Sequence, residues 1–449
     1  MAESVAAVCR ARPVTIVGSG FAAAAVILHL SKRGVPCKQM RVLGPAPLGV
    51  GHAYGCKCPY FRLNVRTDIQ RIWPDEPMHF DQWAKQIIDD PDSAHPAGNF
   101  YRRADYGRYL SEQLHALPDF NDLDHRESLA QEVMAVDSGW MVQCEDGARY
   151  VTTHLIVATG NPEPQWPVPL ESLETSGLVK NPWKGEWLDT LDPRARICLV
   201  GSGLTAMDAI HALDQLGHQG PIRVLAPHGL LPPRQVNWTP QHPLDWPHHL
   251  RGSSFVRFMR KALSGAGWTE IEWQERFEAL RVNLSSAWQT LPLEDRRRLL
   301  RRLGWLWSLC RFRASPQTVE SAERLQSRGQ LRLVKGRMKY LRRTGRAWDI
   351  GYADQQNLEA DVVVNCTGMG HDPLLTGMIQ HNLIQALESS LSPRVNMQMQ
   401  LFTRAGDTHQ NLFCLGSATG LALGDIVGST SIARQAARLS EALIADQTE

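Results

Sequence analysis

The sequence predicts an α/β protein of two nested domains, each with a parallel sheet, and a helical insert in the second. Three observations predict this fold. Apolar strands at 14–17 and 197–200 each run into a Gly-Ser-Gly turn and a following helix. Two more apolar strands, at 155–158 and 361–366, each end in Thr-Gly. The stretch 240–330 has a helical pattern and is rich in tryptophan and arginine.

The two glycine turns have the composition of dinucleotide-binding sites. Gly18 and Gly201 allow a tight turn, and Gly20 and Gly203 have no Cβ, so a pyrophosphate can approach the backbone. The next helix offers N–H groups and the positive end of its dipole to the phosphates. A strand–turn–helix unit that needs glycine only to turn is the alternative. Because the pattern occurs twice, the sequence favours two Rossmann-like dinucleotide-binding domains.

Length and charge limit the class of protein. The 449 residues, 43% of them hydrophobic, suffice for two sizeable cores. A net charge of +2 favours neither nucleic acid nor an acidic partner. No run approaches the ~18 apolar residues of a spanning helix, and residues 1–12 do not resemble a secretion signal. We therefore expect a cytoplasmic protein with no nucleic-acid partner and no membrane span; the oligomeric state stays unknown.

The nine cysteines do not form a recognisable framework. Cys198, Cys366 and Cys414 fall in expected core strands, where we predict inert thiols. Cys56 and Cys58 are the only close pair, and their spacing fits neither a zinc site nor a two-residue dithiol motif. We expect loop cysteines without a redox role, no metal and no catalytic disulfide.

The expected elements follow in order along the chain. The first half contains a strand and helix at 13–32, a strand at 39–43, a glycine-rich loop at 49–55, helices at 78–88 and 106–117, and a hairpin over 140–151. The second half contains strands at 197–200, 222–226, 331–334, 348–352, 361–366 and 411–416 and a helix at 430–445. We interpret the strands at 361 and 411 as the return of the first domain. The predicted domains are 1–165, 166–340 with the insert 240–330, and 341–449.

Several short motifs carry a family resemblance. They include Gly49-Val50-Gly51-His52-Ala53-Tyr54, Leu63-Asn64-Val65, Asn181-Pro182-Trp183, Gly201-Ser202-Gly203-Leu204-Thr205-Ala206-Met207-Asp208, and Arg311-Phe312-Arg313. In these motifs the chain resembles the bacterial FAD-NAD(P)-binding group, two-dinucleotide-domain flavoproteins related to flavin monooxygenases and amine N-hydroxylases. The resemblance implies an FAD domain interrupted by a domain that binds NADPH or NADH.

The resemblance also implies which residues form the sites. His52, Tyr54 and Asn64 would lie nearest the flavin, with His52 and Asn64 as catalytic candidates. A loop histidine with no proton to transfer and an asparagine in a turn or cap are the alternatives. For Asp208, packing or a salt bridge is favoured over catalysis. The other expected cofactor ligands are Gly18, Gly20, Phe21, Ala22, Gly49, Gly51, Thr159, Gly160, Gly201, Gly203, Leu204, Thr205, His228, Thr367, Gly368, Gly416 and Asp425.

The FAD domain departs from the usual pattern in its acidic residues. No acid stands near Leu43, where one often binds the ribose hydroxyls. The usual Gly-Asp near the last strand is Gly416-Ser417, and Asp425 is the candidate replacement.

The second domain departs from the pattern at the expected 2′-phosphate clamp. Two arginines are replaced by Pro227 and His228, and no acid that would select NADH stands there. Arg223, His228 or Arg234 could still meet the phosphate, so we favour NADPH slightly over NADH.

The expected activity is that of an FAD-dependent NAD(P)H oxidoreductase, most readily a monooxygenase that hydroxylates a small organic molecule. A nitrogen of an amine or amino acid is mildly preferred, by analogy alone. A flavin dehydrogenase or reductase that does not use oxygen is one alternative. A non-catalytic, flavoprotein-like binding module is another.

The helical insert has two open interpretations. Its six tryptophans form either an aromatic core or a lid over a planar substrate, and the core is favoured. The arginine run before Leu299, residues 296–298, is expected on a solvated helix face, with an anionic substrate group or a membrane surface as the alternative.

Overall fold

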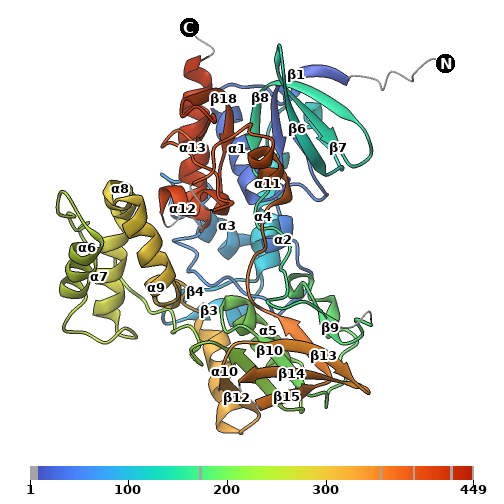
Figure 1. The fold of residues 1–449 in the computed structure, drawn as a ribbon, viewed down its shortest axis with the longest axis vertical. Coiled ribbons are helices and arrows are strands. Elements are labelled where there is room, and N and C mark those ends of the chain that lie inside the picture. Colours follow the sequence, from blue (N-terminus) through green and yellow to red (C-terminus); the bar gives the residue numbers. More distant parts are fainter. Residues whose placement is uncertain (1–8, 171–173, 354–355, 388–389, 425–427, 447–449) are drawn as a thin grey trace.

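Two sheet domains and a lobe of helices make up the described chain (Figure 1). The computed structural model describes residues 9–170, 174–353, 356–387, 390–424 and 428–446. The first domain lies at the top of Figure 1, the second at the bottom, and the lobe beside both.

The first domain is built on a mostly parallel sheet in the order β17-β18-β8-β1-β2-β5. Its strands are β1 (Cys9–Val17), β2 (Met40–Leu43), β5 (Asp124–Arg126), β8 (Arg149–Val157), β17 (Gln400–Phe402) and β18 (Thr408–Cys414). The hairpin β6 (Ala130–Val136) and β7 (Gly139–Cys144) extends the sheet along the first half of β8. The expected hairpin over 140–151 is therefore confirmed as β7 and β8.

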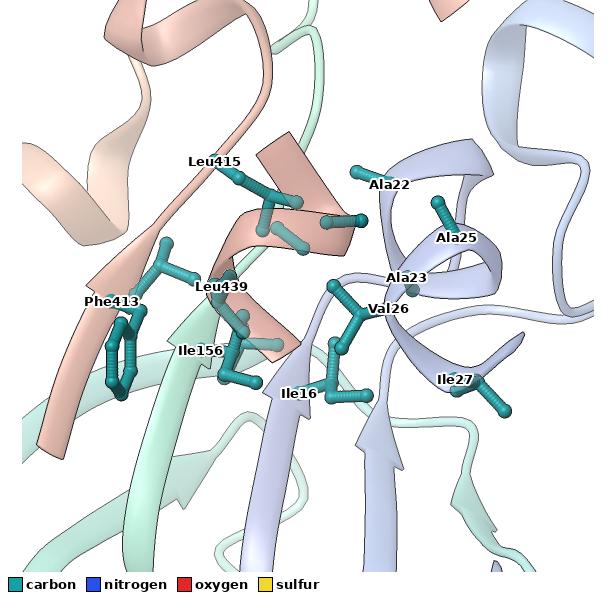
Figure 2. Packing of buried hydrophobic residues seen from close by; sticks show 14 of the residues in the cluster. Ile16, Ala22, Ala23, Ala25, Val26, Ile27, Ile156, Phe413, Leu415 and Leu439 are labelled. Carbon is teal, nitrogen blue, oxygen red and sulfur yellow. The ribbon is translucent and has the colours of Figure 1, made fainter. Parts of the chain in front are cut away.

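Helices cover one face of this sheet because their apolar residues point at it. Figure 2 shows Ile16 of β1, Ile156 of β8 and Phe413 of β18 beneath Val26 and Leu439. Those two side chains belong to α1 (Phe21–Lys32) and α13 (Ser429–Asp446), which pack against each other. The first ten residues of α1 are all buried, since the helix lies between the sheet, α13 and α4 (Arg103–His115). α4 and α3 (His79–Ile87) confirm the helices expected at 106–117 and 78–88.

The second domain has a fully parallel sheet in the order β12-β11-β10-β16-β9. Its strands are β9 (Leu178–Val179), β10 (Ile197–Val200), β11 (Ile222–Ala226), β12 (Leu331–Lys335) and β16 (Val362–Asn365). Alternate residues face opposite sides. One side packs on α5 (Leu204–Gln215) and α10 (Pro316–Ser327). The other packs on a small antiparallel sheet of β13 (Tyr340–Thr344), β14 (Ala347–Ala353) and β15 (Gln356–Ala360).

One strand assignment from the sequence is wrong. The strand at 361–366 was expected in the first domain, but β16 pairs in parallel with β10, Val364 opposite Leu199. The small sheet of β13–β15 and the strand β16 therefore belong to the second domain, and not to the first-domain return expected for 341–449. The strand at 411–416 was assigned correctly, since β18 pairs with β8. Both strands are apolar, and this local pattern does not encode which sheet a strand joins.

The helical lobe holds two small apolar cores of its own. Its helices are α6 (Gly252–Ala262), α7 (Ile271–Val282), α8 (Leu284–Thr290) and α9 (Leu293–Arg311). α10 falls within the predicted insert 240–330, yet it packs against α5 in the core of the second domain. The remaining short elements are α2 (Gly51–Tyr54), β3 (Ala94–His95), β4 (Gly98–Asn99), α11 (Pro373–Gln380) and α12 (Gly420–Leu423).

Candidate cofactor sites

A cavity of about 1130 Å³ lies where the strands of the first sheet end. Its wall is formed by the first glycine turn, the end of β2, α2 and the loop after it, the end of β8, and the linker around residues 180–189. Ligands of open α/β sheets bind at this edge, outside the carboxyl ends of the strands. The predicted residues that line the cavity are Gly18, Gly20, Phe21, Ala22, Gly51, His52, Tyr54, Thr159, Gly160 and Gly416.

The first glycine turn has the shape that a pyrophosphate needs. Gly18 has φ +106°, and a Cβ there would lie 2.2 Å from the carbonyl oxygen of Ala158. Gly20 faces the backbone of Gly51, 3.5 Å from the position of a Cβ. In the described chain no side chain caps the start of α1, so its first N–H groups remain available to an anion. The residues present therefore fit the diphosphate of FAD.

Among the described residues that line the cavity, those at the end of β2 include no acid. Ser19 Oγ donates a hydrogen bond of 2.5 Å to the Pro45 carbonyl, which fixes the turn after the strand. The nearby wall is supplied by Pro45, Ala46 and Pro47 and by the apolar Leu129 and Ala130. A ribose and an adenine would meet backbone and apolar surface here.

Asp372 also lines the cavity, and the sequence interpretation missed it. Its Oδ1 accepts a hydrogen bond from the Leu375 N–H as the cap of α11, and its Oδ2 accepts one from the Thr159 hydroxyl. The signal was present as Asp372-Pro373, a cap residue followed by proline at the first helical position. The predicted replacement acid, Asp425, lies outside the described residues.

The residues expected nearest the flavin do not all lie in the cavity wall. His52 is exposed and lines the cavity. Tyr54 also lines it and accepts a 2.8 Å hydrogen bond from Gln70 Nε2, while burial raises the pKa of its hydroxyl. Asn64 is buried outside this wall, and its Oδ1 has no partner in the described chain. The roles of His52 and Asn64 stay predictions.

Gly49 does not line the cavity, and its contacts indicate a structural role. Its φ is +93°, and a Cβ would lie 2.9 Å from Leu114 Cδ1. Its N–H donates a 2.7 Å hydrogen bond to the Ser19 carbonyl, which ties the second glycine loop to the first turn.

The second glycine turn repeats the geometry of the first. Gly201 has φ +104°, and a Cβ would lie 2.3 Å from the Cys366 carbonyl oxygen. Gly203 precedes α5 and has open space around its Cα, with Leu204 and Thr205 in the first turn. The next strand end is also ordered, since the Thr367 hydroxyl donates a 2.6 Å hydrogen bond to Asn365 Oδ1. This backbone fits a second dinucleotide.

Two of the cations expected near a 2′-phosphate, Arg234 and Arg223, have hydrogen-bond partners within the protein. Arg234 pairs with Glu320 at 2.9 Å and with Glu323 at 2.8 Å. Arg223 donates a 3.2 Å hydrogen bond to the carbonyl of Ile222, within its own strand.

His228 and a lysine that the sequence interpretation missed lie closer to the end of β11. Gly229, next to His228, would place a Cβ 3.2 Å from Cβ of Lys335, at the end of the adjoining strand β12. The His228 ring stacks on Trp305 with centroids 3.7 Å apart. Thr367 and Gly368, expected as ligands, end the strand on the other side of β10.

Most of the insert tryptophans belong to the lobe's cores, as favoured from the sequence. Trp246, Trp268, Trp273, Trp288 and Trp307 pack in its two apolar clusters. Trp305 differs: 40% of it is exposed. In the run before Leu299, Arg298 is exposed but Arg296 and Arg297 are half-buried, so the expected solvated face holds for only part of the run.

An ion pair joins the two sheet domains beside the cavity. Arg103 at the start of α4 and Asp208 on α5 lie 2.8 Å apart. Burial raises the pKa of Asp208 to about 6, although Arg103 opposes the shift. The salt-bridge interpretation of Asp208 is therefore confirmed.

Two sheets of mostly parallel strands, each with a glycine turn before a helix, define a fold with two dinucleotide-binding domains. Residues 15–162 match the model of a family described as FAD-NAD(P)-binding. No curated protein matches the sequence. In the described chain no helix is long and apolar enough to cross a membrane, and no group of three or more His, Cys, Asp or Glu could hold a metal ion.

Solved structures share this fold at low sequence identity. The ornithine N-hydroxylase KtzI of Kutzneria sp. 744 superposes with a TM-score of 0.63 and 12% identity, covering 98% of this chain and 100% of that one. The FAD-bound cadaverine monooxygenase DfoA of Erwinia amylovora gives 0.67 and 13%, covering 97% and 95%. The thioredoxin reductase of T. acidophilum gives 0.55 and 11%, covering 98% and 100%.

Proposed function

We propose that this protein is an FAD-dependent, NAD(P)H-consuming monooxygenase that hydroxylates a small organic substrate, with a nitrogen of an amine or amino acid as the preferred target. The observation that carries the proposal is the repeated glycine turn. Gly18 and Gly201 share the same positive φ and the same close approach to a neighbouring strand end, on two different sheets. Two dinucleotides can therefore bind one chain, as hydride transfer between them requires.

The chain's own residues would hold FAD along the cavity. The N–H groups at the start of α1 would bind the diphosphate, and the close backbones of Gly20 and Gly51 leave room for it. His52, Tyr54 and Asp372 line the same cavity and would contact the rest of the cofactor or the substrate. When bound, FAD would accept hydride, and its reduced form would react with oxygen.

The second domain would hold the nicotinamide dinucleotide, with NADPH preferred. The start of α5 would bind its diphosphate in the manner of α1. Lys335 and His228 flank the end of β11, where a 2′-phosphate would need a positive partner. No acid occupies residues 226–232 to select NADH.

The choice of substrate rests on the solved neighbours. KtzI is an ornithine N-hydroxylase and DfoA a cadaverine monooxygenase, and both cover nearly all of this chain. A flavin reductase is the second candidate function, because a thioredoxin reductase shares the fold over a similar length.

The first experiment is the absorbance spectrum of the purified full-length protein, followed by anaerobic addition of NADPH or NADH. Bound flavin that bleaches with either nucleotide would support both sites. Oxygen uptake that depends on an added amine or amino acid, with a hydroxylated product, would support the monooxygenase. Bleaching without oxygenated product from ornithine, lysine or cadaverine would favour the reductase. Protein that takes up no flavin on reconstitution would overturn the proposal and favour a binding module.

A further inference from the structure

Cys56 and Cys58 lie at the junction of the cofactor cavity and the linker to the second domain. Both line the cavity, in the loop that follows α2. Cys56 is buried among apolar residues of the second domain's core, and Cys58 is half-buried beside it. From the sequence they were expected to be loop cysteines without a redox role. Their surroundings in the structure instead favour a redox role.

The two thiols face each other. The Cys58 N–H donates a hydrogen bond of 3.2 Å to Cys56 Sγ. The Cys56 thiol in turn donates to the carbonyl of Lys184, at 3.3 Å. The two sulfurs also lie near one point, since a Cβ on Gly185 would be 3.3 Å from Sγ of Cys56 and 3.6 Å from Sγ of Cys58.

The linker rests directly on this pair. Gly185 has φ +78°, and a Cβ there would lie 2.7 Å from Cβ of Cys58 and 3.3 Å from Sγ of Cys56. A larger residue would collide with the cysteines, so glycine lets the linker backbone approach them. A covalent change at the sulfurs must therefore alter the contact with Lys184 and Gly185.

The surroundings make the two sulfurs chemically different. The hydrogen bond from Cys58 and the charge of Arg103 lower the pKa of the Cys56 thiol, against opposing effects of burial and Asp208. The hydrogen bond to Cys56 and burial raise the pKa of Cys58. Thiolates are the reactive form of cysteine, so Cys56 is the attacking sulfur and Cys58 the resolving one.

We propose that Cys56 and Cys58 form a peroxide-reactive dithiol that controls the contact between the first domain and the linker. The Cys56 thiolate attacks hydrogen peroxide, breaking the O–O bond to give a sulfenic acid and hydroxide. The Cys58 sulfur then displaces the sulfenic hydroxyl, forming the S–S bond and releasing water. The two thiols lose two electrons in total, and the peroxide accepts them. Cys56 then has no S–H to donate to the Lys184 carbonyl.

The test is peptide mass mapping of the full-length protein after stoichiometric hydrogen peroxide, with remaining thiols blocked. We expect the peptide containing both cysteines to lose two hydrogen atoms, to escape blocking, and to recover with dithiothreitol. This readout does not need flavin or turnover, so it is independent of the proposed function. Cys56 and Cys58 that both remain as thiols while other cysteines are oxidised would overturn the proposal.

Single substitutions distinguish the roles of the two sulfurs. In Cys58→Ser the sulfenic acid should persist on Cys56 and be captured by dimedone, whereas Cys56→Ser should give no captured acid at Cys58. Cys310→Ser, at a buried cysteine of the lobe, should still form the Cys56–Cys58 bond. Capture at Cys58 and not at Cys56 would contradict the assigned roles.

A second measurement tests the linker. Limited trypsin digestion should cut the oxidised protein after Lys184 several-fold faster than the reduced protein, because the carbonyl has lost its partner. Cleavage after the exposed Lys38 serves as the internal reference. Equal cleavage rates after Lys184 in the oxidised and reduced protein would overturn the proposal that the dithiol controls the linker contact.

Discussion

The guanidinium of Arg103 and the carboxylate of Asp208 lie 2.8 Å apart and connect α4 of the first domain with α5 of the second. Both side chains are largely buried, and the Trp183 ring of the linker lies 5.8 Å from the guanidinium. A pair in this position fixes how the two cofactor domains face each other. Removal of one partner leaves a buried charge uncompensated.

Arg103→Ala should therefore destabilise the protein in a pH-dependent way. Burial raises the pKa of Asp208 in the folded protein to about 6, above its value in the unfolded chain. Below the unfolded pKa the carboxyl is protonated in both states, and the protein keeps its full stability. As the pH rises through 6, the buried carboxyl must ionise, and this stability is lost. Without Arg103 that pKa rises further. We expect a loss of about 3–5 kcal/mol at pH 8, and a smaller loss at pH 5, in urea unfolding.

Arg108→Ala on the same helix is the matched control. Arg108 pairs with Glu112 at 2.9 Å on the exposed face of α4. Its removal should cost less than about 1 kcal/mol at either pH. Equal losses for the two variants, or a loss for Arg103→Ala that is larger at pH 5, would contradict this account.

The two glycine turns should be separable by substitution. Gly18→Ala places a Cβ 2.2 Å from a backbone oxygen, and Gly201→Ala does so at 2.3 Å. We expect Gly18→Ala to lose flavin absorbance. Gly201→Ala should keep the flavin but lose its anaerobic reduction by NADPH.

Gly34→Ala is the control for backbone strain, since Gly34 has φ +89° but nothing within 4 Å of a Cβ. It should cost about 1–2 kcal/mol of stability and leave both cofactor readouts unchanged. Loss of flavin in Gly201→Ala, with Gly18→Ala still yellow, would reverse the assignment of the two sites.

The sequence predicted the parts of the fold that local patterns encode. Gly18 and Gly201 carry the turn geometry in their own neighbourhood, and both turns were found where expected. The strand before Thr367 was placed in the wrong sheet because its pairing with β10 depends on contacts far away in the sequence. Lys335 was missed for the same reason, because its position near a site depends on the neighbouring strand. Asp372 has a local helix-cap signal, but its place in the cavity wall depends on distant elements.

Lys335 and His228 should decide between the two nicotinamide cofactors. Lys335→Ala removes a positive charge beside the end of β11, where only NADPH would carry a 2′-phosphate. We expect KM for NADPH to rise about tenfold and KM for NADH to change less than twofold, since a charge-assisted hydrogen bond contributes about 1.5 kcal/mol or more. Stopped-flow reduction of the flavin by each nucleotide measures this.

Arg332→Ala is the control, because Arg332 is exposed on the same strand, three residues before Lys335. It should leave both values unchanged. An equal rise of KM for NADPH and NADH in Lys335→Ala would show that the lysine does not recognise the 2′-phosphate.

Substitution of two tryptophans of the lobe should lower stability by different amounts. Trp288 is buried in the lobe's core, and its Nε1 donates a 3.3 Å hydrogen bond to the Leu421 carbonyl of the first domain. Trp288→Ala should cost about 3–5 kcal/mol. Trp305 is 40% exposed and stacks on His228 of the second domain. Trp305→Ala should cost less than about 1.5 kcal/mol, the upper value for an aromatic pair.

The effect of Trp305→Ala should fall on the nicotinamide site. The Trp305 ring covers His228, so its loss exposes the imidazole at the end of β11 and removes one contact between the lobe and the second domain. We expect a change in KM for NADPH, with the flavin spectrum and unfolding midpoint close to those of the unsubstituted protein. Trp305→Phe, which preserves an aromatic stack, should restore most of the affinity. If Trp305→Ala instead unfolded as readily as Trp288→Ala, the ring would belong to the lobe's core and the stack on His228 would have no separate role.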